Sequence, residues 1–193
     1  MDCVDPGKSM IRLARERCHE WPHVRFYAAR FEEAALPSQA YDLAFSAHAF
    51  HWIAPAVRLR KTARLLRKGG SLALLYNYPG ASGGETMTRL SGLIQRESGG
   101  MLTRWRYLDD VRSWTREICS SGLFHDLTVC RHSWDLSYTA EEYVGLFRTY
   151  SDFLSLPTAL QQRVSDCIMR FIGKHGGVIR RPYDSLLIHA RKA

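Results

Sequence analysis

The 193-residue chain contains no apolar run that approaches the roughly 20 residues a membrane-spanning helix needs. It opens with no signal-peptide pattern, and it has no internal repeat and no low-complexity tract. A hydrophobic share of 46% and a charged share of 24% argue against disorder. We therefore expect a folded, cytoplasmic protein with no membrane partner, of a length that suits one domain.

Cysteine is sparse, with five residues in the chain. Their number is odd, and they form no Cys-x-x-Cys pair. This pattern argues against a disulfide framework and favours an intracellular protein with reduced thiols. We expect buried, reduced thiols at Cys3, Cys18, Cys119, Cys130 and Cys167.

Acidic residues are also scarce, at 19 against 27 basic ones, which gives a net charge of +8. A basic balance attracts nucleic acid, anionic membranes and acidic substrates. The arginines, however, are spread over helical segments instead of forming a tract, and no nucleic-acid-binding module is recognised. A nucleic-acid partner is therefore not expected.

Strands and helices alternate over the first 76 residues. Strands are predicted at residues 1–4, 24–27, 41–46 and 71–76. Pro6 and Pro55 suit the first turns of two helices, and Gly69-Gly70 is predicted to end the second helix. The first helix carries an apolar stripe at Met10, Leu13, Ala14 and Cys18. This alternation predicts a parallel α/β sheet.

Helices dominate after residue 77. Asp109-Asp110 is predicted to cap a helix, and Thr139 with Glu142 forms a capping box for another. Strands are predicted at 127–136 and 183–190. The helices are predicted to bury Met87, Leu90 and Ile94, then Val111, Trp114 and Ile118, and finally Leu160, Val164, Ile168 and Phe171.

Five short motifs follow one another in an order that carries a resemblance. They are Cys3-Val4-Asp5-Pro6-Gly7, Ala29-Arg30-Phe31-Glu32-Glu33, Tyr41-Asp42-Leu43, Phe50-His51-Trp52 and Lys68-Gly69-Gly70. In this order and spacing the chain resembles the class I, Rossmann-like methyltransferases that use S-adenosylmethionine (SAM), specifically the type 11 family. The likeness spans nearly the whole chain. It is strongest over 3–78 and again over 176–183.

The resemblance implies an α/β fold: a doubly wound, mostly parallel Rossmann-like sheet, truncated at its N-terminus, with an antiparallel C-terminal edge and a helical lid. One methyltransferase-like domain is expected over 1–193. Within it we expect a partial SAM-binding core at 1–78, helical substrate and lid segments at 79–125 and 137–176, and edge strands at 126–136 and 177–193.

The resemblance makes Asp5 the ribose-binding acid, with Pro6 beside it in the cofactor site. A carboxylate at the end of such a strand accepts hydrogen bonds from both ribose hydroxyls. A helix cap is the alternative for Asp5, because Asp before Pro is common at helix starts for capping alone.

The segment Arg30-Phe31-Glu32 is expected to cradle the adenine ring of SAM. The alternative is a surface loop in which Phe31 fills the core and Glu32 pairs with a nearby arginine. The resemblance further places Ser46 and Ala47 along the methionine part of SAM.

The resemblance also makes Phe50, His51 and Trp52 the walls of the methyl-transfer site. His51 is the candidate general base, since an imidazole has an ordinary pKa of about 6.5. Packing is the alternative role for this residue. No metal site is expected, because His48 and His51 have no further ligands at suitable spacing.

The acceptor is expected to be a small molecule that contacts His51, Trp52, Tyr143 and Phe147. The alternative for the two later aromatics is helix packing. Basic residues at the mouth of the pocket would favour an acidic acceptor, and the candidates are Arg104, Arg106 and Arg148.

In the resembled family a central strand and a glycine-rich turn precede the acid, whereas this chain begins almost at Asp5. Two strand edges would then lack partners, at about 1–3 kcal/mol for each buried unpaired group. Direct pairing of the two strands, a strand lent by a second copy, a separate chain, or a longer natural protein would each compensate. We predict that the strands ending at Asp5 and Phe45 pair directly or through an intermolecular contact.

Taken together, the sequence predicts a SAM-dependent methyltransferase acting on a small molecule. The alternative is a truncated, non-catalytic homologue: a pseudoenzyme or a partner-binding subunit.

Overall fold

A computed structural model gives the structure of residues 1–80, 84–102 and 107–193, with the side chains of 107–110 left outside the description. The chain falls into two compact units. The first unit comprises residues 1–76, 112–130 and 187–193, and the second comprises 77–111 and 131–186. The expectation of one domain over 1–193 stays a prediction.

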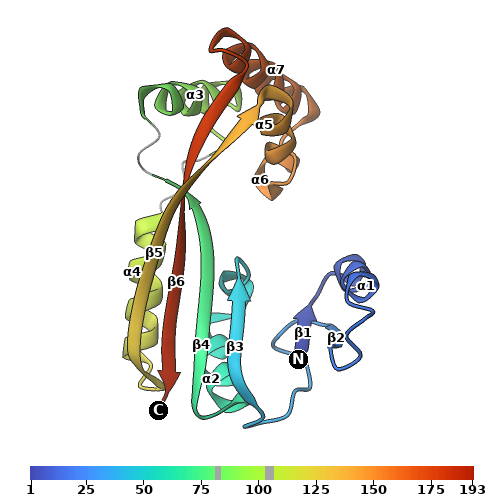
Figure 1. Cartoon of the computed structure of the whole chain (residues 1–193), viewed down its shortest axis with the longest axis vertical. Helices are drawn as coiled ribbons and strands as arrows, with labels where there is room; N and C mark the ends of the chain where they lie inside the picture. The colour runs from blue at the N-terminus through green and yellow to red at the C-terminus, as the bar shows by residue number, and fades with distance from the viewer. Residues whose placement is uncertain (81–83, 103–106) are drawn as a thin grey trace. The chain divides into compact units, whose positions relative to one another are not determined.

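The chain begins with a β–α–β element in the first unit (Figure 1). It consists of β1 (Asp2–Asp5), α1 (Lys8–Arg17) and β2 (Arg25–Ala28). The two strands pair in parallel, with Asp2 opposite Arg25 and Asp5 opposite Ala28. Both strands and the helix were predicted from the sequence.

A second, four-stranded sheet has the order β3-β4-β6-β5. Its strands are β3 (Tyr41–Ala47), β4 (Leu66–Pro79), β5 (Phe124–Thr139) and β6 (Val178–Lys192). β3 pairs in parallel with β4, and η1 (Phe50–Trp52) and α2 (Pro55–Leu65) connect them. The arrows of Figure 1 show β6 running against its neighbours. The α/β class and the antiparallel C-terminal edge are confirmed.

The helix α2 ends earlier than predicted. Leu66 is fully buried and already pairs with Tyr41, so the strand begins before the two glycines. Gly69 and Gly70 lie instead at an irregularity in the β3–β4 register, where Gly69 has a φ of +72°. A Cβ on Gly70 would lie 3.0 Å from the Arg67 carbonyl oxygen. The glycines therefore permit a bulge in the ladder and do not end the helix.

β1 and β3 belong to different sheets. The strands that end at Asp5 and Phe45 therefore do not pair directly, and their pairing through an intermolecular contact stays a prediction. Among the described residues β1 pairs with β2 alone and β3 with β4 alone, so one edge of each strand has no ladder. Leu43 and Phe45 are 55% and 59% exposed, although parallel strands of an α/β sheet are normally covered on both faces.

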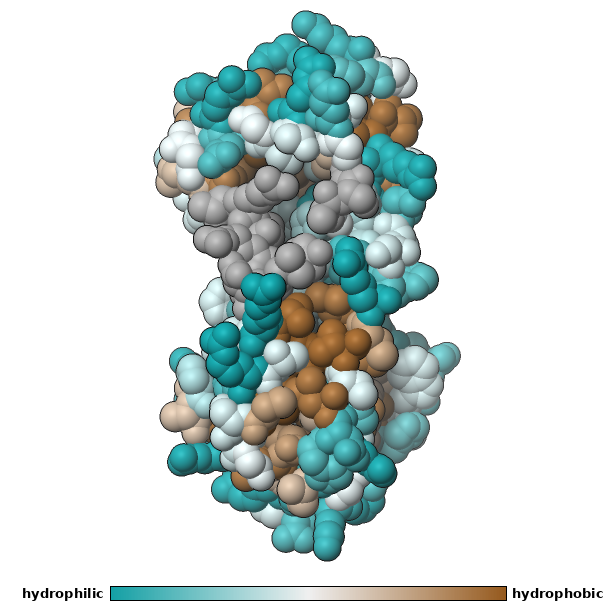
Figure 2. Space-filling view, turned by 90° about the vertical axis from the view of Figure 1, so that its left-hand side faces the viewer, coloured by the Kyte–Doolittle hydropathy of each residue, from teal (hydrophilic) through white to brown (hydrophobic). Residues whose placement is uncertain are grey.

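The apolar stripe predicted for α1 is largely uncovered. Met10 and Leu13 are exposed, and Ile11 is the buried residue of this helix. The reason is that α1 packs on a two-stranded sheet, which is too narrow to cover the stripe. Figure 2, viewed from the side away from α1, shows a separate group of hydrophobic residues at the surface in the lower part of the view. Contiguous exposed apolar surface of this kind marks a site of interaction.

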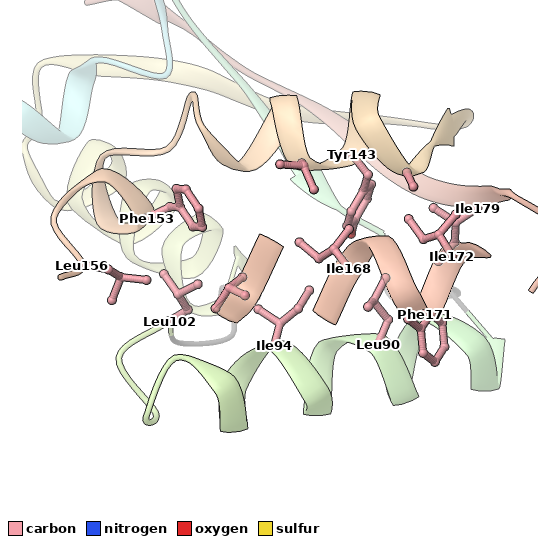
Figure 3. Close-up of a cluster of buried hydrophobic side chains, with 13 residues drawn as sticks. Leu90, Ile94, Leu102, Tyr143, Phe153, Leu156, Ile168, Phe171, Ile172 and Ile179 are labelled. Atoms are coloured by element: carbon pink, nitrogen blue, oxygen red, sulfur yellow. The ribbon is translucent and has the colours of Figure 1, made fainter. Parts of the chain in front are cut away.

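The second unit is organised around a hydrophobic cluster (Figure 3). Three helices build it: α3 (Gly84–Glu97), α5 (Ala140–Phe147) and α7 (Thr158–Lys174). Leu90 of α3 and Ile168 of α7 are fully buried, and α6 (Ser151–Leu154) adds Phe153. The predicted buried faces of α3 and α7 are thereby confirmed.

The helix α4 (Tyr107–Ser120) buries Trp114 and Ile118, as predicted. In the first unit the Arg58 guanidinium lies 4.4 Å from the centre of the Trp114 ring and is hydrogen-bonded to Glu117. The predicted cap at Asp109-Asp110 lies outside the described side chains.

The cysteine prediction is only partly met. All five thiols are free, but Cys119 and Cys130 are exposed, because they lie on outward positions of α4 and β5. Cys167 alone is buried, in α7. Over the described ranges, the helices are all too short or too polar to cross a bilayer.

The Thr139 capping box is present in full. The Glu142 backbone N–H donates to the Thr139 hydroxyl at 3.2 Å, and the Thr139 N–H donates to the Glu142 carboxylate at 2.8 Å. These bonds satisfy two donors that the first turn of α5 leaves without helical partners.

We expect Thr139→Ala to lower the free energy of unfolding by about 1 kcal/mol, because the cap is lost. Urea denaturation followed by circular dichroism measures the change. Thr88→Ala is the control, since the exposed Thr88 hydroxyl bonds only to the Gly84 carbonyl within α3. An equal loss in the two variants would contradict the capping role.

A side-chain bridge joins β1 to β3 at their first residues. The Asp2 carboxylate is buried and accepts hydrogen bonds from the Tyr41 hydroxyl and, at 2.6 and 2.8 Å, from Arg25. Burial acts to raise the pKa of Asp2, but these hydrogen bonds outweigh it and hold the pKa below its usual value. Burial and the bond to Asp2 raise the pKa of Tyr41 to about 12.

This bridge makes stability depend on pH at both extremes. The lowered Asp2 pKa contributes stability above about pH 4 that is lost as the pH falls through the folded value. The raised Tyr41 pKa contributes stability below about pH 10 that is lost as the pH rises toward 12. Tyr41→Phe should lower the free energy of unfolding by about 1–2 kcal/mol at pH 7. It should also reduce the loss of stability between pH 10 and 12, because the titrating hydroxyl is gone.

Chemical denaturation between pH 3 and 12 tests this, with Tyr27→Phe as the control. Tyr27 is half-buried in β2, and its hydroxyl has no hydrogen bond within the described part of the chain. The bridge would be of no consequence if the two variants gave the same pH profile.

Candidate functional site

A cavity of about 670 Å³ lies in the first unit along the facing edges of β1 and β3. Its walls come from β1, from β3 between Tyr41 and Ser46, from the loop after β2, and from η1 and α2. Carboxyl ends of parallel strands are where α/β sheets bind ligands. The cavity extends beyond those ends, because it also occupies the space between the two sheets.

Asp5 lies in the cavity wall, with Pro6 next to it. The Gly7 N–H donates to Asp5 Oδ1 at 2.7 Å, which fixes the carboxylate, while Oδ2 has no hydrogen-bond partner among the described residues. A Cβ at residue 7 would lie 2.9 Å from Oδ1, so a larger residue there would displace the carboxylate from this position. The Gly7–Asp5 bond forms a local turn, whereas α1 begins with Gly7 as its N-cap and has no side-chain cap, so the helix-cap alternative for Asp5 is wrong. One carboxylate oxygen remains available for a ligand.

The segment Arg30-Phe31-Glu32 also lines the cavity. The Ala54 N–H donates to Glu32 Oε1 at 2.9 Å, so Glu32 holds the start of α2. This backbone bond lowers the pKa of Glu32. Arg30 lies 3.6 Å from the same oxygen. The arginine pairing foreseen for Glu32 is therefore present.

Lys61 of α2 holds this segment in place by hydrogen bonds to its backbone. The sequence did not predict this role. Its buried ammonium donates to the carbonyl oxygens of Glu32 and Ala34 at 3.0 and 2.7 Å, and lies 5.2 Å from the centre of the Phe31 ring. Desolvation lowers its pKa. No sequence signal separates Lys61 from the surface lysines, because only the fold brings it under the loop.

At the end of β3 the two predicted residues differ. Ser46 is half-buried and lines the cavity, whereas Ala47, the last residue of β3, is exposed and not part of the wall. The chain then turns at His48, which has a φ of +52°.

The three residues of η1 also divide. Phe50 is buried against Trp114, with ring centres 5.6 Å apart, and one side of it reaches the cavity. Trp52 lines the cavity and is 73% exposed. His51 is exposed and outside the wall, with its ring 5.1 Å from that of Trp52. The structure thus places the candidate base beside the cavity.

Tyr143 and Phe147, the predicted acceptor contacts, lie in the second unit. Tyr143 is buried in the helical cluster, and Phe147 packs against that cluster. Arg148 follows α5 and is exposed. The predicted basic residues Arg104 and Arg106 lie outside the described residues.

The cavity therefore combines mostly apolar walls with a few fixed polar groups, the composition typical of small-molecule sites. Asp2 and Tyr41 are further wall residues that sequence reasoning did not identify. Their link spans two strands that are 39 residues apart in sequence, and no local pattern encodes it.

Comparison with known proteins agrees with this architecture. Residues 2–74 match a type 11 family model described as a methyltransferase domain. An uncharacterised methyltransferase of Mycobacterium bovis is 25% identical over 197 residues, covering 98% of this chain and 73% of that protein.

Solved structures extend the likeness to the fold of the whole chain. A protein of Anaeromyxobacter dehalogenans assigned to the type II methyltransferases has a TM-score of 0.63 at 20% identity, with 98% of this chain and 79% of that one covered. Geranyl diphosphate C-methyltransferase of Streptomyces coelicolor, solved with Mg²⁺, geranyl diphosphate and S-adenosyl-L-homocysteine, has a TM-score of 0.50 at 15% identity, with 100% and 63% covered. Residues 2–74 therefore match the type 11 methyltransferase family, and the chain as a whole has a fold similar to that of solved methyltransferases.

Proposed function

We propose that this chain binds SAM in the cavity of the first unit and transfers its methyl group to a small-molecule acceptor. One observation carries the proposal. The C-terminal ends of β1 and β3 and the loop after β2 bring Asp5, Ser46 and the 30–32 segment to one cavity. Relatives solved with SAM or S-adenosyl-L-homocysteine support the choice of cofactor.

The residues of the wall suit the parts of this cofactor. Asp5 Oδ2 accepts hydrogen bonds from ribose hydroxyls, while Gly7 holds the other oxygen in place. Phe31 covers one face of the adenine ring, and Lys61 keeps the loop in position. Ser46 contacts the amino-acid part of the cofactor.

SAM supplies a methyl group activated by a sulfonium. The chain's own task is then to align the acceptor and exclude water. Phe50 is buried against Trp114 and forms a fixed wall, and the exposed Trp52 covers the bound acceptor from the surface. His51, next to Trp52, takes the proton from an acceptor that must lose one.

A second candidate function is favoured by the unpaired edges of β1 and β3. In it the chain is a partner-binding, non-catalytic homologue, completed by a strand from a second copy or another polypeptide. Leu43 and Phe45 would be covered by that strand. Binding of the cofactor separates the two candidates.

We expect S-adenosyl-L-homocysteine to bind with a Kd in the micromolar range, about −8 kcal/mol, in isothermal titration calorimetry. Asp5→Ala should weaken it about 10- to 100-fold, because a hydrogen bond to a charged group contributes about 1.5–3 kcal/mol. Asp42→Ala is the matched control, since Asp42 is exposed and pairs with Arg67. Absence of binding at millimolar ligand would contradict the enzymatic proposal and favour the second candidate.

We also expect the chain to self-associate through its open edges. Sedimentation velocity over a hundredfold range of concentration should show a dimer. Phe45→Lys should disrupt this dimer, because a charge on β3 would prevent another strand from pairing with its open edge. Leu154→Lys, an equally exposed position on α6, should leave the dimer intact. If the chain is strictly monomeric, the self-association is refuted, and the partner of the open edges would be a different polypeptide.

A further inference from the structure

Arg181, on β6 in the second unit, is a buried cation. Its side chain is only 5% exposed. One guanidinium nitrogen, Nη1, donates to the Tyr150 hydroxyl at 3.2 Å. The Nε atom is buried without a hydrogen-bond partner in the described part of the chain.

Three other arginines of this unit show the opposite arrangement. Arg131, Arg163 and Arg180 are exposed, yet each is paired with a carboxylate. A buried charge is costly unless it is paired, whereas an exposed one needs no partner. Arg181, the buried arginine, is thus the one for which the described residues supply no carboxylate partner.

The acidic residue nearest to Arg181 in sequence, Asp184, already has hydrogen-bond partners of its own. Asp184 belongs to the same strand, but alternation directs it to the face opposite Arg181. Its carboxylate accepts hydrogen bonds from Arg131 and from the Ser133 hydroxyl at 2.6 Å.

Aromatic rings surround the guanidinium instead. Its carbon lies 5.5 Å from the centre of the Tyr143 ring and 5.0 Å from that of Tyr183. The Tyr183 and Tyr138 hydroxyls lie 2.8 Å apart. Such contacts stabilise a cation but leave its charge in place.

The phenols cannot neutralise that charge by ionising. Burial raises the pKa of Tyr143, and burial together with the Tyr138 hydrogen bond raises that of Tyr183. At neutral pH both are uncharged hydroxyls that can donate hydrogen bonds. A fork of guanidinium donors beside hydroxyl donors is suited to the oxygens of a carboxylate or phosphate.

We propose that Arg181, with the Tyr150 and Tyr183 hydroxyls, binds a carboxylate or phosphate group. The site differs from the surface residue Arg148 considered from the sequence, because its donors are already desolvated and held by the helical cluster.

Thermal unfolding with inorganic phosphate, compared with sodium chloride at equal ionic strength, tests this site. A parallel series with acetate distinguishes phosphate from carboxylate preference. We expect one of the two anions to raise the Tm of the wild-type chain. Arg181→Met should weaken the apparent affinity at least tenfold, whereas Arg180→Met, an exposed neighbour paired with Asp135, should leave it within twofold.

Tyr150→Phe is the second variant, because it removes one donor and retains the ring. It should weaken anion binding several-fold, and it answers the question if Arg181→Met does not fold. Equal anion responses in wild type, Arg181→Met and Tyr150→Phe, or no response in wild type, would overturn the proposal.

Titration with S-adenosyl-L-homocysteine keeps this result separate from the proposed function. All the cavity residues belong to the first unit, so Arg181→Met should bind this ligand as the wild type does. If the ligand fails to bind while the anion response depends on Arg181, the anion site stands and the proposed SAM-binding function falls.

Discussion

Backbone hydrogen bonding between neighbouring strands is the constraint on which the first unit depends. β1 and β3 each satisfy it on one edge, through β2 and β4. On the other edge, the Asp2–Tyr41 bridge is a side-chain link that leaves the backbone groups of both strands without a ladder. The cavity, the exposed Leu43 and Phe45, and the uncovered face of α1 all follow from that interrupted sheet.

Elements set by local chemistry were predictable from the sequence. Thr139 and Glu142 form the capping box their spacing indicates, and the periodic apolar residues of α7 are buried as expected. Features set by distant neighbours were not. Gly69-Gly70 looks like a helix stop, but Leu66 pairs with Tyr41 and draws the chain into a strand first. The stripe of α1 is helical as predicted, yet its burial depends on a surface that two strands do not provide.

The same division applies to the sites. The meeting of Asp5, Pro6, the 30–32 segment and Ser46 at one cavity could be predicted because each lies at or just after the C-terminal end of a strand. Lys61 and Arg181 could not, since burial of a cation is decided by tertiary packing and has no signature in a charged sequence. His51 shows the converse, because a residue type suited to catalysis lies next to the cavity wall instead of in it.

The separate β1–β2 sheet has a consequence for how the molecule comes apart. Four residue pairs hold this sheet, and the helix between its strands buries one side chain. A segment with so few cooperative contacts opens at a lower free energy than the rest of its unit. Amide protons of β1 should therefore exchange through local openings, and the loop that presents Asp5 is tethered to the least cooperative part of the fold.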